Sequence, residues 1–277
     1  MSSFGDLSRI NTNLQSMDSL RTLQNTNAEL GRRQLRLATG SRINRAEDDS
    51  AGYSIATKIQ AKVRGQAQAL SNVGDAKSML TMAEGSLSSI MEILQTMKEK
   101  TIQAANDTLG STERTAIDSQ ITALSAEITD ILGDTKFNST SLFTSSAFSF
   151  QVNAAAADSF SVTVGTLSVA GMAVASGDID VSTAALATGL LASIDAAVTT
   201  ISNKMGNIGD SQKRLTFKQD ALGIAMNNNE AARSRIADTD FAKEQMHIVK
   251  LQILQQTGTA AVAQANAAPQ SLLQLLQ

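Results

Sequence analysis

The segment VGDAKSMLTMAEGSLSSIMEILQTMKEKTIQA, residues 73–104, decides the fold. Within it, two sets of apolar residues each recur every seven positions, offset from each other by three: Val73, Leu80, Leu87 and Leu94, and Ala76, Ala83, Ile90, Met97 and Ala104. A seven-residue repeat sustained over this length predicts a helix packed in a coiled coil. We expect the helix over residues 51–107, which at 1.5 Å per residue makes a rod of roughly 80 Å.

Helical spacing marks four further segments: residues 7–38, 117–131, 190–235 and 251–275. In each of them apolar or small residues alternate at intervals of three and four, as on one face of a packed helix. Pro269, the single proline of the chain, should kink or restart the last helix. The predicted fold is therefore mainly α, a long antiparallel coiled-coil rod in which N- and C-terminal helices pair.

The middle of the chain differs in composition. Residues 139–189 are rich in Ser, Thr, Ala and Gly and nearly free of charge. Two runs alternate apolar and polar residues in the manner of strands, residues 148–152 and 160–164, with a turn-like segment between them. These runs predict a β-hairpin, so the chain goes out as helices, turns in a small β region and returns as helices.

Composition excludes several classes of function. The chain has no Cys and one His, so it can form neither a disulfide framework nor a zinc site of Cys or His clusters. The net charge of -3 gives no basic excess for nucleic acid, and the apolar stretches are too short for membrane insertion. No ordered set of catalytic residues stands out. The sequence therefore predicts a protein that is not an enzyme and uses no cofactor or metal.

The helix predicted at each end of the chain carries a narrow stripe of apolar or small residues along one face. These two helices extend beyond the rod. A helix with one apolar stripe must bury it against something, and a pair of end helices buries little area when one of them is mostly Ala and Gly. We therefore predict that neighbouring copies of the chain cover these stripes. The predicted polymerisation residues of the stripes are Leu14, Leu20, Leu23, Leu30, Leu37, Leu251, Leu254, Gly258, Ala261, Ala265 and Leu272. A separate polar line on the last helix comprises Gln252, Gln256, Thr259, Asn266 and Gln270.

Longer motifs at both ends carry a family resemblance. LATGSRINRAEDDSAG, residues 37–52, resembles the N-terminal signature of bacterial flagellins, and INTN, residues 10–13, resembles the start of that family. At the other end, IADTDFA, residues 236–242, and QILQQTGTAAVAQANAAPQSLLQLL, residues 252–276, resemble its C-terminal signature. The resemblance covers roughly residues 9–164 and 190–277.

The resemblance implies a structural subunit that self-assembles into the helical flagellar filament for swimming motility. It implies inner-tube terminal helices in residues 1–45 and 236–277, a rod in residues 46–143 and 190–235, and a short variable outer region in residues 144–189. Within the N-terminal signature, Arg42, Ile43, Asn44, Asp48 and Asp49 join the predicted polymerisation interface. The polar line would then face the channel of the filament.

The implied partners are other copies of the chain, an export chaperone and export gate, the filament cap and the hook–filament junction proteins. The implied location is the extracellular flagellum, reached by type III export without a cleaved signal peptide. Residues 94–100, LQTMKEK, lack the first Arg and the second Leu of the family pattern linked to innate-immune receptor recognition, so weak recognition is expected.

Two other structural functions stay open at this point. A hook–filament junction protein shares related terminal helices, although the full-length C-terminal motif favours flagellin. A coiled-coil scaffold or signalling protein would stay a monomer or dimer and never form tubes. The basic cluster of Arg32, Arg33, Arg36, Arg42 and Arg45 has no interleaved aromatic residues for nucleic acid. We expect it to pair with carboxylates such as Asp48 and Asp49 or to lie between subunits.

Overall fold

The computed structural model describes the backbone of residues 12–155 and 157–275, and the side chains of these residues up to Ala267. Its helices are α1 (Leu14–Thr39), α2 (Ser50–Ala104), α3 (Ser111–Asp134), α4 (Ala184–Ala237) and α5 (Phe241–Leu275), with a 3-10 turn η1 (Ala170–Met172). Its strands are β1 (Lys136–Phe137), β2 (Thr140–Ser141), β3 (Phe148–Gln151) and β4 (Ser159–Val162). The predicted fold class, long helices with a small β-hairpin, is confirmed.

The chain divides into two compact units. The terminal unit comprises the residues up to 61 and those from 228 onward, and the central unit comprises residues 62–227. The long helices α2 and α4 each contribute to both. The domain boundaries expected at residues 45/46 and 235/236 stay a prediction.

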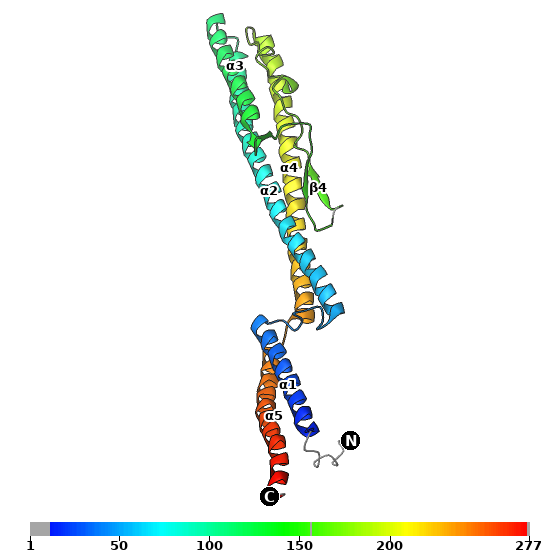
Figure 1. Ribbon diagram of the computed structural model, residues 1–277. Coiled ribbons are helices and arrows are strands. Elements are labelled where there is room, and N and C mark those ends of the chain that lie inside the picture. The colour runs from blue at the N-terminus through cyan, green and yellow to red at the C-terminus, as the bar shows by residue number, and fades with distance from the viewer. Residues whose placement is uncertain (1–11, 156, 276–277) are drawn as a thin grey trace. The chain divides into compact units, whose positions relative to one another are not determined.

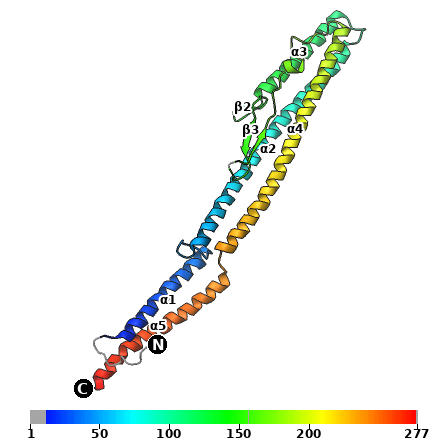
Figure 2. The ribbon, with the colours of Figure 1, turned by 90° about the vertical axis from the view of Figure 1, so that its right-hand side faces the viewer.

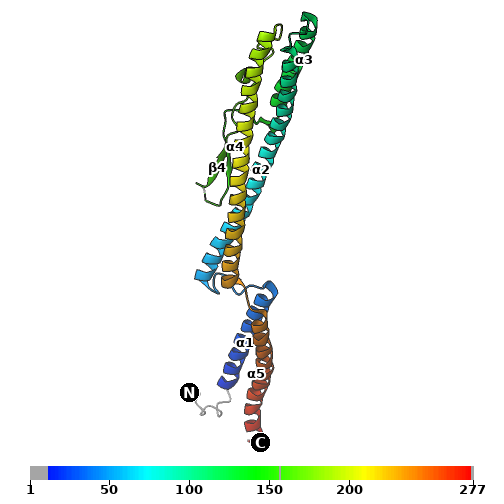
Figure 3. The same cartoon turned by 180° about the vertical axis from the view of Figure 1, so that it is seen from behind.

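In the central unit, α2 and α4 run side by side with α3 along part of their length (Figures 1 and 3). The heptad positions of α2 are buried, and so are their counterparts Ile194, Ile201, Ile208, Leu215 and Leu222 on α4. The predicted coiled-coil seam is therefore the core of this unit. At its margin Lys98 and Asp195 form an exposed ion pair of 2.5 Å between α2 and α4.

The predicted hairpin is confirmed. Strand β3 pairs antiparallel with β4, so that Phe148 lies opposite Val162 and Phe150 opposite Phe160. Figure 1 shows β4 lying along α4. Phe160 and Val162 are buried in the core of the unit, and the guanidinium of Arg214 on α4 stacks 4.7 Å from the centre of the Phe160 ring. The hairpin is thus held by apolar burial and by a cation–π contact.

The charge-poor middle packs into the same core instead of standing apart from it. Val164, Met172, Val174 and Val181 are all buried in the core that α2, α3 and α4 share. The buried Ser125 hydroxyl of α3 donates to the Val174 carbonyl oxygen at 2.7 Å, which pins this irregular segment to the helix. Ser and Thr therefore supply the turns, while scattered Val and Met supply the buried contacts.

Helix ends differ from the predicted ends for local reasons. Helix α4 begins at Ala184, six residues earlier than expected, because the Thr183 hydroxyl accepts a hydrogen bond from the Leu186 amide and caps it. Helix α2 ends at Ala104, and the buried Arg114 folds the following turn by donating to the carbonyl oxygens of Asn106 and Leu109. Helix α5 is not restarted by Pro269 and continues to Leu275.

One stretch of α4 has the length and mean hydropathy of a membrane span, with a value of 1.6 over 18 residues. Its helix carries the seam residues Leu190, Ile194, Ala197 and Ile201, which are buried in the core of the central unit. About 28% of the window is buried in this core.

Candidate functional site

The terminal unit contains the motifs that the sequence singled out, and its frame is the antiparallel pair of α1 and α5, which lie side by side in Figure 2. Leu30 of α1 and Ile248 and Ala265 of α5 are buried between them. At Gly258 an added Cβ would come 3.2 Å from the Leu23 Cδ1 atom, so the absence of a side chain lets the two helices approach closely.

Polar side chains fix the register of this pair. The Asn13 amide donates to the Ala265 carbonyl oxygen at 2.8 Å, and the Ser16 hydroxyl donates to the Asn266 Oδ1 atom at 2.7 Å. Further along, the Gln255 amide donates to the Asn27 Oδ1 atom at 2.8 Å. Because a polar contact in a helical seam is lost when the helices slide, these bonds select one alignment.

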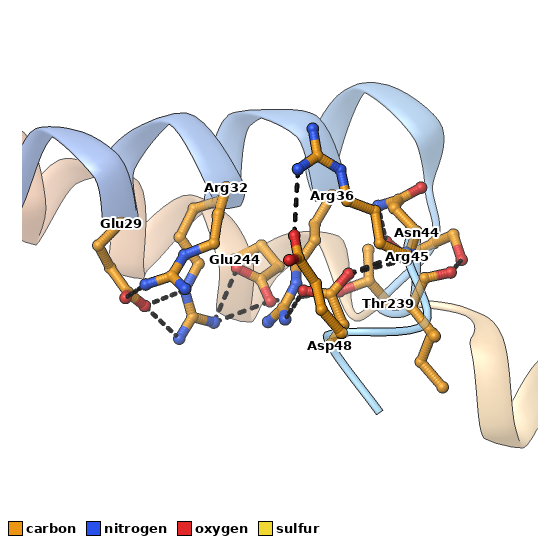
Figure 4. Close-up of polar contacts among 12 residues, drawn as sticks. Glu29, Arg32, Arg36, Asn44, Arg45, Asp48, Thr239 and Glu244 are labelled. Atoms are coloured by element: carbon orange, nitrogen blue, oxygen red, sulfur yellow. Dashed lines mark hydrogen bonds and ion pairs between the residues drawn. The ribbon is translucent and has the colours of Figure 1, made fainter. Parts of the chain in front are cut away.

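An ion network lies toward the C-terminal half of α1 (Figure 4). Arg33 Nη1 donates to both carboxylate oxygens of Glu244 on α5, at 3.0 and 3.1 Å, and Glu244 is buried. Arg33 also binds Glu29, which pairs with the exposed Arg32 at 2.7 Å. Desolvation alone would raise the pKa of Glu29, but its hydrogen bonds and attraction to Arg33 and Arg32 lower that pKa below its ordinary value.

The segment after α1 pairs with the segment after α4. Gly40 ends α1 with a φ of 66°, which favours glycine, and its carbonyl oxygen accepts a hydrogen bond from the Thr239 amide at 3.0 Å. The Arg42 amide donates to the Ala237 carbonyl oxygen at 2.6 Å, and the Arg42 guanidinium donates to the Ile236 carbonyl oxygen at 2.7 Å. Arg42 therefore caps the C-terminal end of α4, where carbonyl oxygens lack helical partners.

Asp48 holds the loop between α1 and α2. Its Oδ2 atom accepts the backbone amides of Asn44 and Arg45 at 3.2 and 3.1 Å, and its Oδ1 atom lies 3.4 Å from Arg36 Nη2. Desolvation opposes ionisation most strongly, but the two amides and the Arg36 charge together lower the pKa of Asp48. Figure 4 shows Arg36, Asn44 and Arg45 around this carboxylate.

Asp49 caps α2. Its Oδ1 atom accepts the Gly52 amide at 2.9 Å, as expected for an Asp at a helix start. A Cβ on Gly52 would lie 2.4 Å from Asp49 Oδ2 and 2.7 Å from the Cδ1 atom of the buried Ile43. The sequence Asp49-Ser50-Ala51-Gly52 thus combines a capping carboxylate with the one residue that leaves room for it.

The predicted polymerisation residues fall into three groups. Leu30, Ile43 and Ala265 are buried within the single chain, and Leu23, Leu37, Asn44, Asp48, Asp49, Leu251 and Gly258 are partly buried. Leu14, Leu20, Arg42, Leu254 and Ala261 are exposed, and so are Gln252, Gln256, Thr259 and Asn266 of the polar line. Gln270 and Leu272 lie outside the described side chains. Their roles between copies of the chain stay predictions.

The expected pairing of the basic cluster holds for Arg36 with Asp48, while no ion pair links any described arginine to Asp49.

Sequence reasoning missed the contact of Arg33 with Glu244, because these residues lie 211 positions apart. It also missed the exposed apolar residues Met246, Val249 and Ile253 on α5. A sequence pattern does indicate which face of α5 meets α1, because residues on that face alternate at intervals of four and three. They are Glu244, Ile248, Leu251, Gln255, Gly258, Val262 and Ala265.

Comparison with known proteins gives the family. Residues 10–147 match the bacterial flagellin N-terminal helical region, and residues 191–276 match the bacterial flagellin C-terminal helical region. A flagellin of Halalkalibacterium halodurans is 34% identical over 271 residues, which cover 97% of this chain and 99% of that protein. The flagellar filament 33 kDa core protein of Treponema phagedenis is 32% identical over 284 residues, with the same coverage of both chains.

A solved structure agrees in fold. The putative flagellar hook-associated protein of Vibrio parahaemolyticus has a TM-score of 0.60 over 69% of this chain and 100% of its own, at 15% identity. This likeness concerns the fold alone, whereas the proteins related along nearly the whole chain are flagellins and filament core proteins. Flagellins are structural subunits of the extracellular flagellar filament, and this chain belongs to the bacterial flagellin family.

Proposed function

We propose that this chain polymerises into the flagellar filament through its terminal unit, with the paired helices α1 and α5 as the main contact between copies. The observation that carries the proposal is the exposure of Leu14, Leu20 and Leu254 on a two-helix pair. Apolar side chains on a narrow pair gain free energy when a neighbour covers them, at about 25 cal/mol per Å². A polymer offers such a neighbour to every copy.

The loop between α1 and α2, which carries the N-terminal motif of residues 37–52, also contributes to the proposed contact between copies. Ile43, Asp48 and Asp49 hold the loop between α1 and α2, and Arg42 ties it to the end of α4. These contacts hold the loop after α1 against the segment from which α5 begins. The exposed Arg42 and the partly buried Asn44 would then meet neighbouring copies, as the sequence predicts.

The polar line is proposed to face the filament channel. Gln252, Gln256 and Thr259 are exposed and lie on a different face of α5 from the seam with α1, while the exposed Asn266 lies at the edge of that seam, where it accepts the Ser16 hydroxyl. Amide and hydroxyl groups keep water at such a wall, so an exported chain would bind it only weakly. Gln270 would extend the line.

Partners before and after assembly follow from the same surfaces. An exposed apolar face must be shielded until it is buried, which supports an export chaperone on the C-terminal helix. We propose delivery through the flagellar export gate without a cleaved signal peptide, and contacts with the filament cap and the hook–filament junction proteins at the two ends of the polymer.

Seeded growth tests the proposal. Purified chains mixed with sheared filament fragments should lengthen them, as seen by electron microscopy. Chains lacking residues 1–37 and 251–277 should fail to lengthen the same fragments, while their circular dichroism keeps the helical signal of the central unit. Tubes built by the truncated chain, or intact chains that stay monomeric at every concentration, would refute the proposal.

The family is a structural one, and we propose no catalytic activity. The hook–filament junction alternative is not favoured, because flagellins and filament core proteins match 97% of this chain at 30% identity or more. A junction protein would also be present at only a few copies per filament. Immunogold labelling along whole filaments separates the two.

A further inference from the structure

The helical path of the chain is interrupted twice in the terminal unit, between α1 and α2 and between α4 and α5. The first interruption has a local cause, because Gly40 takes a φ of 66° and ends α1. The second spans only residues 238–240. A helix that is stopped by its own sequence usually ends at Gly or Asn, often with Pro soon after, and residues 236–242, IADTDFA, contain none of these.

Helix α5 does have a local start signal. The Asp240 Oδ1 atom accepts the Lys243 amide at 3.1 Å and so caps the helix. Such a cap does not by itself interrupt a helix, because Asp and Thr are only modestly less favourable than Ala within one. The Asp238 amide still donates to the Ser234 carbonyl oxygen at 2.9 Å, so the helical bonding of α4 reaches into the break. The local sequence is therefore compatible with one continuous helix through residues 236–241.

Arg42 occupies carbonyl oxygens that a continuous helix would use. In such a helix the Ile236 and Ala237 carbonyl oxygens would accept the amides four positions further on. Here the Arg42 guanidinium donates to the Ile236 carbonyl oxygen at 2.7 Å, and the Arg42 amide donates to that of Ala237 at 2.6 Å. The bonds that would carry the helix across the break are thus replaced by bonds from the segment after α1.

The replacement also works in the opposite direction. The Thr239 amide, which in a continuous helix would donate four positions back, donates to the Gly40 carbonyl oxygen at 3.0 Å. Ser41 and Asp238 form an antiparallel β-bridge, and the Ser41 hydroxyl lies 2.9 Å from the Ala237 carbonyl oxygen. Sharp bends in helices that lack Pro and Gly arise where another group inserts into the hydrogen-bond ladder. Residues 40–42 are such an insertion.

We propose that the break between α4 and α5 is conditional on the docking of residues 40–42. While these residues are docked, they hold residues 238–240 outside helical geometry. When they are released, residues 238–240 become helical and α4 continues into α5. Ala237 is buried, and buried carbonyl oxygens are rarely left without a partner, so its carbonyl oxygen exchanges one amide for another. The proposal concerns a single chain and does not depend on the formation of filaments.

Release should also separate Arg33 from Glu244. A helix rises 1.5 Å per residue and an extended chain about 3.3 Å, so conversion of residues 238–240 to helix draws α5 toward α4 by up to roughly 5 Å. Glu244 lies one turn into α5, and its contacts of 3.0 and 3.1 Å with Arg33 do not survive a displacement of this size. The seam of α1 with α5 therefore favours the docked state, and the segment after α1 sets the course of the C-terminal helix.

Carbon-13 labelling of threonine and aspartate tests the proposal in the full-length chain, because a Cα resonance moves downfield when its residue becomes helical. The variant Ser41→Ala/Arg42→Pro removes the donors that residues 41 and 42 offer to the end of α4. Residue 41 forms the β-bridge, where the extended backbone that precedes a proline is already present. The Thr239 and Asp240 Cα resonances should move from non-helical to helical positions.

Two further variants serve as controls. Ala46→Pro places a proline in the same loop, at the second position of the turn that the Asp48 amide closes on the Arg45 carbonyl oxygen, where proline is favoured. It should leave the Thr239 resonance in place. Phe241→Pro, added to the double variant, should return that resonance to its non-helical position. The first residue of α5 accepts a proline, whereas the interior of a continuous helix does not.

Each outcome decides. Non-helical resonances of Thr239 and Asp240 in Ser41→Ala/Arg42→Pro mean that the break is encoded locally, and they overturn the proposal. Helical resonances in the natural chain or in Ala46→Pro overturn it as well. If circular dichroism shows that the double variant has lost the central helices, Ser41→Ala/Arg42→Ala, which keeps the backbone amide, decides by the same criterion. Failure of the natural chain to lengthen filament fragments would overturn the proposed function and leave this result untouched.

Discussion

Arg33 and Glu244 are 211 positions apart in the chain and form an ionic link between α1 and α5, with one guanidinium nitrogen at 3.0 and 3.1 Å from the two carboxylate oxygens. The Glu244 side chain is 8% exposed and that of Arg33 is 23% exposed, so the pair is largely withdrawn from water. Removal of one partner from such a pair leaves an uncompensated charge.

We predict that Arg33→Ala weakens the α1–α5 pair by about 2 kcal/mol, somewhat less than for a fully buried pair because Arg33 keeps some contact with water. The measurement is amide hydrogen exchange of residues 23–37 in polymerised protein, where exchange should accelerate. Arg32→Ala is the control, since among the described residues the exposed Arg32 forms its ion pair with Glu29 and its loss should change the exchange rate little. Equal effects of the two substitutions would show that the link to Glu244 is unimportant.

Acid should loosen the loop between α1 and α2 through Asp48. The folded pKa of Asp48 lies below its ordinary value of 3.8, so its stabilisation is fully present above that value. Stabilisation is then lost as the pH falls below that value and through the folded pKa. The amide resonances of Asn44 and Arg45 should report this titration in an acid series.

Two variants sharpen the test of Asp48. Asp48→Asn should remove this part of the acid sensitivity, because the amide does not titrate in this range. Glu47→Gln is the matched control, since Glu47 is exposed and its ion pair within the described part of the chain is with the exposed Arg45. An acid response of the loop that persists in Asp48→Asn would assign it to another group.

Gly52 should not tolerate a methyl group. Gly52→Ala places a Cβ 2.4 Å from Asp49 Oδ2 and 2.7 Å from Ile43 Cδ1, so the cap or the buried isoleucine must move. We expect a loss of about 1–3 kcal/mol in stability, seen as a lower temperature of thermal unfolding. Gly74→Ala on the same helix meets nothing within 4 Å and should stabilise by up to about 1 kcal/mol. A Gly52→Ala protein as stable as the natural chain would contradict the described loop.

The hairpin should depend on Phe160. Its ring is buried in the core of the central unit and carries the guanidinium of Arg214 on its face. Phe160→Ala should cost about 3–5 kcal/mol and accelerate proteolysis within residues 148–164, because the strands lose their anchor on α4. Ser161→Ala changes an exposed neighbour and should leave the cleavage rate as it is. If both variants are cleaved equally fast, the hairpin is held by other contacts.

Much of the fold follows from periodicity alone. The heptads of α2 and α4 require a shared seam, because Leu and Ile at every seventh position leave one apolar stripe on an otherwise polar helix. The alternation of Phe148-Ser149-Phe150 and Phe160-Ser161-Val162 likewise allows only one face of the hairpin to be buried. The end motifs identified the family for a related reason, since so long a fixed order of residues does not recur by chance in unrelated chains.

The tertiary structure alone decided which face of α5 meets α1. Of the predicted polymerisation stripe, Ala265 is buried and Leu251 and Gly258 are partly buried, whereas Leu254 and Ala261 are exposed, and Gln255 and Val262 lie in or near the seam. A helix rich in Ala and Gln has small or apolar residues on several faces, so its pattern specifies none of them. The choice is made by contacts across more than 200 residues of sequence, those of Asn13 with Ala265, Asn27 with Gln255 and Arg33 with Glu244. Such partners satisfy hydrogen bonds and charges only in one alignment, and no local spacing reveals them.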